Sequence, residues 1–134
     1  MFSDREEARY QRHFSLSAFG RRGQEALKNS SVLCIGAGGL GSPAALYLAS
    51  SGIGRLGLID NDVVDLSNLQ RQILHDEGGI GSSKTESARA RLTELNSDII
   101  IEVHSQRLNA RNVMNLVADY DVILDGSDNF PTRF

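Results

Sequence analysis

A glycine-rich turn between an apolar run and a helical segment is the strongest constraint on how this chain folds. The run 32–35 precedes the segment GAGGLG, in which Gly36, Gly38 and Gly41 have the spacing G-x-G-x-x-G. A strand, such a turn and a helix together form a cradle whose backbone N–H groups and helix dipole favour an anion. Gly36 permits the tight turn, Gly38 the close approach of a ligand, and Gly41 the close packing of helix on strand. A glycine turn that binds no ligand is the alternative.

Hydrophobic periodicity predicts helices and strands that alternate along the chain. Ser3 and Glu6 have the spacing of a capping box, which places a helix start near Asp4, and Ser83 and Glu86 repeat this pattern. The predicted helices are 4–13, 23–29, 41–51, 84–95 and 112–118. The predicted strands are 32–35, 56–60, 99–103 and 122–124. The first strand is continuously apolar, as expected for a strand buried on both faces.

This alternation predicts the α/β class, with a Rossmann-like, doubly wound and mostly parallel sheet. We expect the strand order 3-2-1-4 in this part of the sheet, with further helices at the N-terminus. An N-terminal helical segment would cover residues 1–30, and a nucleotide-binding Rossmann-like domain, incomplete at its C-terminus, would cover 31–134. In the predicted helix 84–95, the residues Ala88, Leu92 and Leu95 form one apolar face.

Composition narrows the classes of protein. The chain has 134 residues and a formal net charge of −3, which argues against a general nucleic-acid binder. Cys34 is the only cysteine, so neither an internal disulfide nor a cysteine metal cluster can form within the chain; its place in a strand makes it a core thiol. No apolar run reaches the roughly 18 residues of a membrane helix, and the charged N-terminus is unlike a signal peptide. We expect a cytoplasmic protein with no nucleic-acid or membrane partner.

An acidic residue follows the glycine turn at the end of the second predicted strand. Asp60 lies 19 residues after Gly41. In a fold of this kind, an acid at that place accepts hydrogen bonds from ribose hydroxyls. Alternatively, Asp60 simply starts a turn with Asn61. A dinucleotide and ATP would both use this loop and this acid, so these residues do not separate an NAD-dependent oxidoreductase from an ATP-using enzyme.

Two cations beyond the second strand favour ATP. Arg71 lies in LSNLQRQ and Lys84 in GSSKTESAR. Breaking a triphosphate of about four negative charges needs several fixed cations, whereas the two phosphates of a nicotinamide cofactor are already served by the glycine turn. Lys84 falls in the first turn of a helix, where a cation is unfavourable unless an anion is near. Taken singly, either residue could be a solvated surface charge.

Carboxylates follow the fourth predicted strand. Asp125 and Asp128 come after the apolar run 122–124, at the edge where open α/β sheets bind ligands. A carboxylate repels a triphosphate unless a magnesium ion lies between them, so Asp128 is a candidate Mg²⁺ ligand. Alternatively, Asp128 and Asn129 cap a following helix with Pro131 near its start.

With these residues in place, the chain resembles the N-terminal part of the E1-like adenylyltransferases, which activate ubiquitin-like sulfur carriers in molybdopterin and thiamine biosynthesis. Five segments carry the resemblance in family order and spacing, over nearly all of the chain. They are ARYQRH, GQEALKNSSVLCIGAGGLGSPAALYLASSGIGRLGLIDND, LSNLQRQILH, GSSKTESARARLTELN and VILDGSDN. Together these segments are far more specific than the glycine motif alone.

The resemblance implies a reaction and a set of partners. The C-terminal glycine carboxylate of a ubiquitin-like sulfur-carrier protein of the MoaD/ThiS type attacks the α-phosphate of ATP, with Mg²⁺, and gives an acyl-adenylate and pyrophosphate. It implies a homodimer in which Arg12 enters the partner subunit's site, although Arg12 alone would read as a helix-surface charge. It also implies the nucleotide contacts, which are Gly36, Gly38, Gly39, Gly41, Asp60 (ribose), Asn68, Arg71 and Lys84 (phosphates), and Asp128 and Asn129.

The chain also departs from the family pattern. Family members are longer, and the part absent here carries the carrier-binding surface, a crossover loop and, in many members, CxxC pairs that hold Zn²⁺. A nucleotide-binding or dimerisation domain without turnover is therefore a further alternative. The histidines His13, His75 and His104 match no catalytic requirement and are expected to be surface or packing residues.

Overall fold

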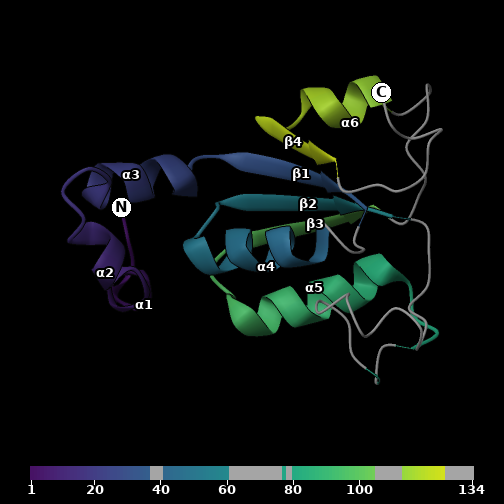
Figure 1. Ribbon diagram of the computed structural model, residues 1–134, viewed down its shortest axis with the longest axis horizontal. Coiled ribbons are helices and arrows are strands. Elements are labelled where there is room, and N and C mark those ends of the chain that lie inside the picture. The colour runs from purple at the N-terminus through teal and green to yellow at the C-terminus, as the bar shows by residue number, and fades with distance from the viewer. Residues whose placement is uncertain (37–40, 61–76, 78–79, 105–112, 126–134) are drawn as a thin grey trace.

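A four-stranded parallel sheet forms the centre of the molecule (Figure 1). The computed structural model describes residues 1–36, 41–60, 77, 80–104 and 113–125. The strands are β1 (Ser31–Ile35), β2 (Arg55–Ile59), β3 (Ile100–His104) and β4 (Val122–Asp125). Their order in space is β3-β2-β1-β4, which confirms the predicted α/β class and strand order. Each predicted strand lies within one residue of the observed one, because the apolar runs that form the buried strands also mark their ends.

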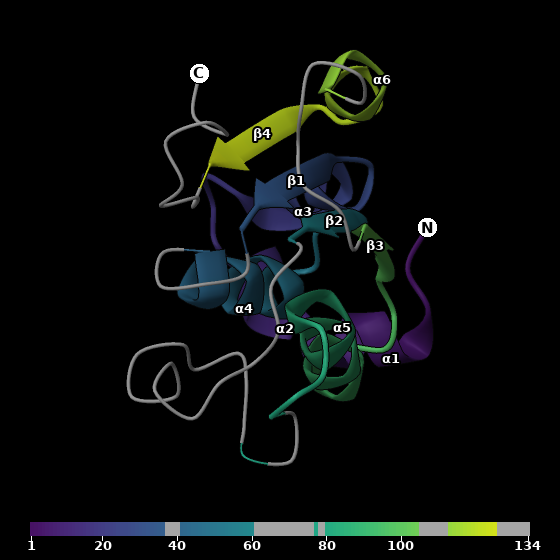
Figure 2. The ribbon, with the colours of Figure 1, turned by 90° about the vertical axis from the view of Figure 1, so that its right-hand side faces the viewer.

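The helices lie on both faces of this sheet and at its N-terminal end. They are α1 (Asp4–Arg9), α2 (Gln11–Phe14), α3 (Gly20–Lys28), α4 (Gly41–Ser51), α5 (Lys84–Leu95) and α6 (Val113–Ala118). Helices α4 and α5 lie side by side on one face and α6 lies on the other (Figure 2). The observed bounds of α4 agree with the prediction at both ends, and α6 begins one residue later than predicted.

The main core lies between the sheet and the helices α4 and α5. The strand β1 is buried along its whole length, as its continuous apolar run predicts. Alanine side chains on both helices allow close approach to the strands, and leucine and valine fill the space between them. The fully buried residues of this layer include Cys34, Ala45, Ala49, Leu56, Leu58, Ala88 and Leu92. Leu95, on the same predicted face as Ala88 and Leu92, is the last residue of α5 and is 37% exposed.

A smaller cluster covers the opposite face of the sheet. Leu33, Ile35 and Ile59 pack there with Tyr120, which precedes β4. The Tyr120 hydroxyl donates to Glu102 at 2.8 Å, and the Arg55 guanidinium lies 4.3 Å from the centre of the Tyr120 ring. Tyr120 is only 8% exposed, and its hydroxyl has a hydrogen-bond acceptor in Glu102 while its ring face contacts the cation of Arg55. This second layer fixes β4 against the sheet and so helps to place the carboxyl end of that strand.

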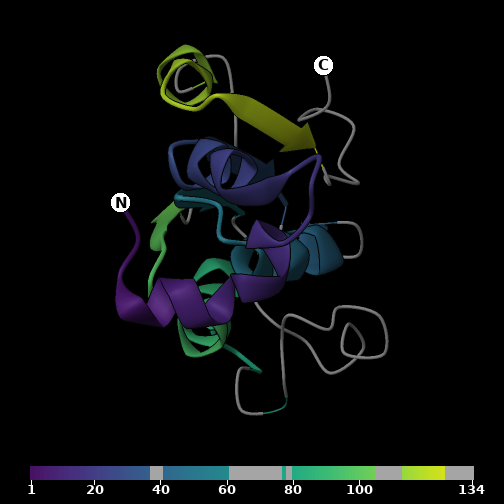
Figure 3. The same cartoon turned by 90° about the vertical axis from the view of Figure 1, so that its left-hand side faces the viewer.

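The N-terminal helices differ from the prediction in one respect that matters below. Ser3 forms the predicted capping box with Glu6, so the helix start near Asp4 is confirmed. The predicted single helix over residues 4–13 was wrong, because it breaks at Tyr10, whose φ of −103° and ψ of 15° separate α1 from α2. The helix predicted over 23–29 begins three residues earlier, at Gly20. Figure 3 shows this group of helices at the end of the molecule that faces the viewer.

Gly54 allows the end of α3 to cross the start of β2 at close range. A Cβ at this position would collide with the backbone carbonyl of Lys28, which cannot swing aside as the tip of a side chain can. We expect Gly54→Ala to lower the free energy of unfolding by about 2 kcal/mol or more, since overpacking outweighs the smaller gain from a stiffer unfolded chain. Chemical denaturation measures this change. Thr93→Ala, on the exposed side of α5, is the control, and equal stability of the two variants would contradict the prediction.

Candidate nucleotide-binding site

The carboxyl edge of the sheet gathers the described residues of the candidate site. The parallel strands all end at this edge, and α4 and α5 run back from it, so the N-termini of both helices lie there (Figure 1). Open α/β sheets bind ligands at this edge, where helix N-termini present free N–H groups. The edge is therefore the place to look for each residue that the sequence singled out.

The glycine turn begins as predicted. Gly36 directly follows β1 with a φ of +89°, a conformation that residues with a Cβ rarely adopt. Its N–H donates to the Ile59 carbonyl at 2.8 Å, which ties the start of the turn to the end of β2. Helix α4 begins at Gly41. Gly38 and Gly39 lie outside the described residues.

Two carboxylates stand at the ends of strands on this edge. Asp60 directly follows β2, is half-buried, and donates its N–H to the His104 carbonyl at 3.2 Å. Asp125 is the last residue of β4 and is level with Ile35, the last residue of β1. The strand register therefore brings Asp60 and Asp125 to the same edge as the glycine turn, on either side of β1.

Lys84 is the first residue of α5 and is only 7% exposed. The N-cap residue Ser83 fixes this helix start by accepting a hydrogen bond from the Glu86 N–H at 3.2 Å, as predicted, and Thr85 is fully buried beside it. The surface-charge interpretation of Lys84 is therefore wrong. A buried cation at the positive end of a helix dipole requires polar or anionic surroundings, and the start of α5 places Lys84 at the carboxyl edge.

Several predicted site residues lie outside the described residues. They are Gly38, Gly39, Asn68, Arg71, Asp128 and Asn129, and His75 lies outside them too. Within the described part of the chain, no group of three or more His, Cys, Asp or Glu side chains could hold a metal ion. Asp125, three residues before Asp128, is the described carboxylate at the end of β4. The structure thus brings Gly36, Gly41, Asp60 and Lys84 to one edge.

Arg12 is far from that edge in its own chain. It lies on α2 with its side chain exposed, and the N-terminal helices sit at the opposite end of the molecule from the carboxyl edge (Figure 1). Helix α4 separates the two ends, since its 11 residues span about 16 Å. Arg12 is therefore not a member of the site at its own carboxyl edge.

Cys34 is a core thiol, as predicted. It is fully buried in β1, and burial raises its pKa to about 12. The thiolate is the reactive form of cysteine, so this thiol is not a nucleophile for the site. His13 and His104 are half-buried, and His104 lies 3.4 Å from the Tyr120 hydroxyl, which fits the packing role expected for both.

The burial of Cys34 predicts very slow labelling of the folded protein. At about pH 8, a pKa near 12 leaves roughly 10⁻⁴ of the thiol ionised. We expect an aromatic disulfide reagent to label the folded chain negligibly and to label one thiol per chain in denaturant. Because Cys34 is the only cysteine, the unfolded chain is its own control. Rapid, stoichiometric labelling of the folded chain would contradict this.

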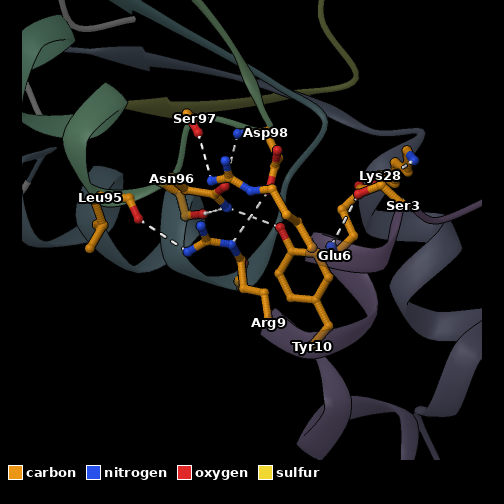
Figure 4. A network of polar contacts seen from close by, with 12 residues as sticks. Ser3, Glu6, Arg9, Tyr10, Lys28, Leu95, Asn96, Ser97 and Asp98 are labelled. Atoms are coloured by element: carbon orange, nitrogen blue, oxygen red, sulfur yellow. Dashed lines mark hydrogen bonds and ion pairs between the residues drawn. The ribbon is translucent and has the colours of Figure 1, made fainter.

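One feature was not predicted from the sequence: a polar joint between the N-terminal helices and the rest of the chain, at the end of the molecule opposite the carboxyl edge (Figure 1). Asn96 and Gln24 are fully buried, and Tyr10 is 2% exposed. Figure 4 shows Asn96 between Tyr10 and the turn that follows α5. The sequence signal for this joint would have been the amide residues Gln24 and Asn96 at positions that face the core. Buried amides need hydrogen-bond partners, and here these partners are distant in sequence.

The described residues include no helix that is both long and apolar enough to span a bilayer.

A parallel sheet in the order 3-2-1-4, with a glycine turn, strand-end acids and a buried lysine at one edge, defines a Rossmann-like nucleotide-binding domain. The ThiF family model matches residues 10–134. The chain belongs to the ThiF family, which confirms the resemblance to the E1-like adenylyltransferases.

Known proteins similar to this chain carry related names. The chain is 57% identical over 127 residues to the adenylyltransferase and sulfurtransferase MOCS3 of Drosophila ananassae, which covers 95% of this chain and 28% of that protein. It is 47% identical over 133 residues to the probable molybdopterin-synthase adenylyltransferase of Porphyra purpurea, covering 99% of this chain and 35% of that protein. The chain thus spans about a third of the length of these relatives.

A solved structure is also similar over most of the chain. It is the E. coli tRNA N6-threonylcarbamoyladenosine dehydratase in complex with ATP, which matches with a TM-score of 0.91 and 27% sequence identity. The match covers 98% of this chain and 54% of that one. The fold is therefore that of the ThiF/E1-like, Rossmann-type adenylyltransferases.

Proposed function

We propose that this chain is the ATP-binding part of an adenylyltransferase that activates the C-terminal glycine of a ubiquitin-like sulfur-carrier protein. The observation that carries this proposal is the buried Lys84 at the first turn of α5, on the same edge as the glycine turn and Asp60. A breaking triphosphate needs several fixed cations at such an edge, whereas the glycine turn already serves the two phosphates of a nicotinamide cofactor. The ATP complex of a structural relative and the names of the sequence relatives agree with this choice.

Each site residue has a distinct task in the proposed reaction. The glycine turn, with Gly36, Gly38, Gly39 and Gly41, lies against the nucleotide, and Asp60 holds the ribose hydroxyls. Asn68, Arg71 and Lys84 bind the phosphates. Asp128 and Asn129 lie beside them, and Asp128 would hold Mg²⁺. The ion would offset the charge of the phosphates and allow a carboxylate to lie close to them.

The bonds change as follows. A carboxylate oxygen of the carrier's C-terminal glycine attacks the α-phosphorus of ATP. The bond from that phosphorus to the oxygen bridging to the β-phosphate breaks, and its electron pair leaves with pyrophosphate. The products are an acyl-adenylate and pyrophosphate. Lys84 and Arg71 act where charge builds up on the leaving phosphates, which is where fixed cations stabilise a transition state most.

A homodimer completes the proposed site. Arg12 lies at the end of the molecule opposite its own carboxyl edge (Figure 1), so it can serve a nucleotide only in another subunit. We propose that it enters the partner subunit's site, and that the protein acts in the cytoplasm. The relatives named for molybdopterin synthase favour the MoaD-type carrier over the carrier of thiamine biosynthesis.

Pyrophosphate exchange tests the proposal. The full-length gene product should exchange labelled pyrophosphate into ATP only when Mg²⁺ and a carrier protein are both present, and purified carriers of the two pathways should differ in supporting it. Tighter binding of NADH than of ATP would instead favour an oxidoreductase. Binding of ATP with no exchange under any of these conditions would favour a nucleotide-binding or dimerisation domain without turnover.

A further inference from the structure

Three buried polar side chains join the N-terminal helices to the sheet and its helices. Tyr10 lies between α1 and α2, Gln24 lies on α3, and Asn96 follows α5. Tyr10 is 2% exposed, and Gln24 and Asn96 are fully buried. Buried amides are costly unless every donor and acceptor is satisfied, so the partners of these three side chains define what the joint holds in place.

The Asn96 carboxamide connects three segments of the chain. Its Nδ2 donates to the Tyr10 hydroxyl at 2.9 Å and to the Ala49 carbonyl, near the end of α4, at 2.8 Å. Its Oδ1 accepts from the Asp98 N–H at 3.1 Å. Both N–H bonds and the carbonyl oxygen of the side chain are therefore used. Through Asn96, the Tyr10 ring is fixed to α4 and to the turn after α5 (Figure 4).

Gln24 makes the second connection, between α4 and His13, the residue that follows Arg12 in the sequence. Its Oε1 lies 2.7 Å from Nδ1 of His13, and its Nε2 donates to the Ser51 carbonyl, the last residue of α4, at 2.7 Å. The His13 and Tyr10 rings are also stacked, with centroids 6.0 Å apart. Arg12 thus lies between two residues, Tyr10 and His13, that are each tied to the end of α4.

Gly52 gives both connections the room that they need. It follows α4 with a φ of +94°, and a Cβ there would lie 2.5 Å from Gln24 Nε2 and 2.6 Å from Tyr10 Cζ. The two side chains therefore converge on one point directly after α4. The other end of α4 begins at the glycine turn, so this one helix connects the contacts of Tyr10 and Gln24 to the carboxyl edge of the sheet.

The basic residues around this joint fall into two groups. Arg5 and Arg9 both face Asp98, at 3.7 and 3.8 Å, and Arg9 also donates to the Leu95 carbonyl at 3.2 Å. Arg12 is exposed and, among the described residues, makes no ion pair. Arg5 and Arg9 reinforce the joint, whereas the exposed side chain of Arg12 can meet an anion that belongs to another molecule.

We propose that Tyr10 and Gln24, held by Asn96, are positioning residues that fix α2 so that Arg12 is presented to the nucleotide of a second copy of the chain. A helix of four residues has almost no stability of its own, so its geometry depends on these anchors. Small misplacements of a catalytic group are costly to rate. This inference rests on the proposed function, in which Arg12 acts in the partner subunit's site.

The test uses Tyr10→Phe, which removes only the hydroxyl that Asn96 holds. In the full-length gene product we expect exchange to fall about tenfold with an unchanged KM for ATP. The variant is then mixed with inactive tester subunits of two kinds. With Lys84→Met subunits, whose N-terminal helices are intact, activity should return. With Arg12→Ala subunits it should not, because neither subunit then presents a well-placed Arg12. Gln24→Met should give the same pattern, and Tyr47→Phe, at a tyrosine that is 76% exposed, should have no effect.

Each other outcome overturns the inference. Full activity of both Tyr10→Phe and Gln24→Met means that the anchors do not position Arg12. Rescue by Arg12→Ala subunits means that the anchors serve their own subunit's site, and rescue by neither tester means general damage. Failure of the proposed function has a different signature: the unsubstituted protein shows no exchange, or the two testers do not restore each other.

Discussion

We expect Lys84→Met to lower carrier-dependent pyrophosphate exchange by roughly 10²-fold or more. Loss of one charge-stabilising group at a developing anion has an effect of this size. Methionine retains the length and apolar stem of a side chain that is 7% exposed, so the packing around Thr85 and the start of α5 is preserved. The substitution therefore removes charge with little change of shape.

The control for this prediction is Arg89→Met, five residues further along the same helix. Arg89 is exposed, so its replacement removes one positive charge from α5 without touching the carboxyl edge. We expect exchange by this variant to stay within about twofold of the unsubstituted protein. If Lys84→Met and Arg89→Met are equally active, the phosphate-binding role of Lys84 is wrong. Arg71→Ala and Asp128→Ala should resemble Lys84→Met, on the same reasoning.

The elements that the sequence predicted well are those determined by local patterns. The continuous apolar run of β1, the glycine turn and the capping residues Ser3 and Ser83 place helix and strand ends within a residue or so, because each signal depends on neighbours in the chain. The order of the strands follows from right-handed connections between parallel strands. The burial of Lys84 was not predicted; the pattern indicated only that a cation in the first turn of a helix is unfavourable unless an anion is near.

The features that the sequence did not predict depend on distant partners. The helix predicted across Tyr10 is broken there, and the partner of that ring, Asn96, lies 86 residues away. The close passage of Gly54 over Lys28 likewise depends on how α3 meets the sheet. Helical periodicity contains no information about either contact. The roles of Arg71 and Asp128 remain predictions from the family pattern, since both lie outside the described residues.

Mixing two inactive variants should restore exchange if Arg12 acts across a dimer. A site needs Lys84 from its own subunit and Arg12 from the partner. In a dimer that pairs an Arg12→Ala subunit with a Lys84→Met subunit, the site on the first subunit has both groups and the other site has neither. When equal amounts of the two variants pair at random, about half of the dimers contain one subunit of each kind. Each of these mixed dimers has one working site of its two.

Activity should therefore rise from near zero to about one quarter of that of the unsubstituted protein once subunits have exchanged. The matched control uses the variant Arg22→Ala in place of Arg12→Ala. Arg22 is a second exposed arginine of the N-terminal helices, and this variant should be active without mixing. Separate proteins assayed without subunit exchange provide the baseline. If Arg12 served its own subunit's site, the mixed dimer would contain no site with both groups, and no activity would return. The quarter-level recovery thus reports directly on which chain supplies the arginine, and it does so without requiring either variant to be active alone.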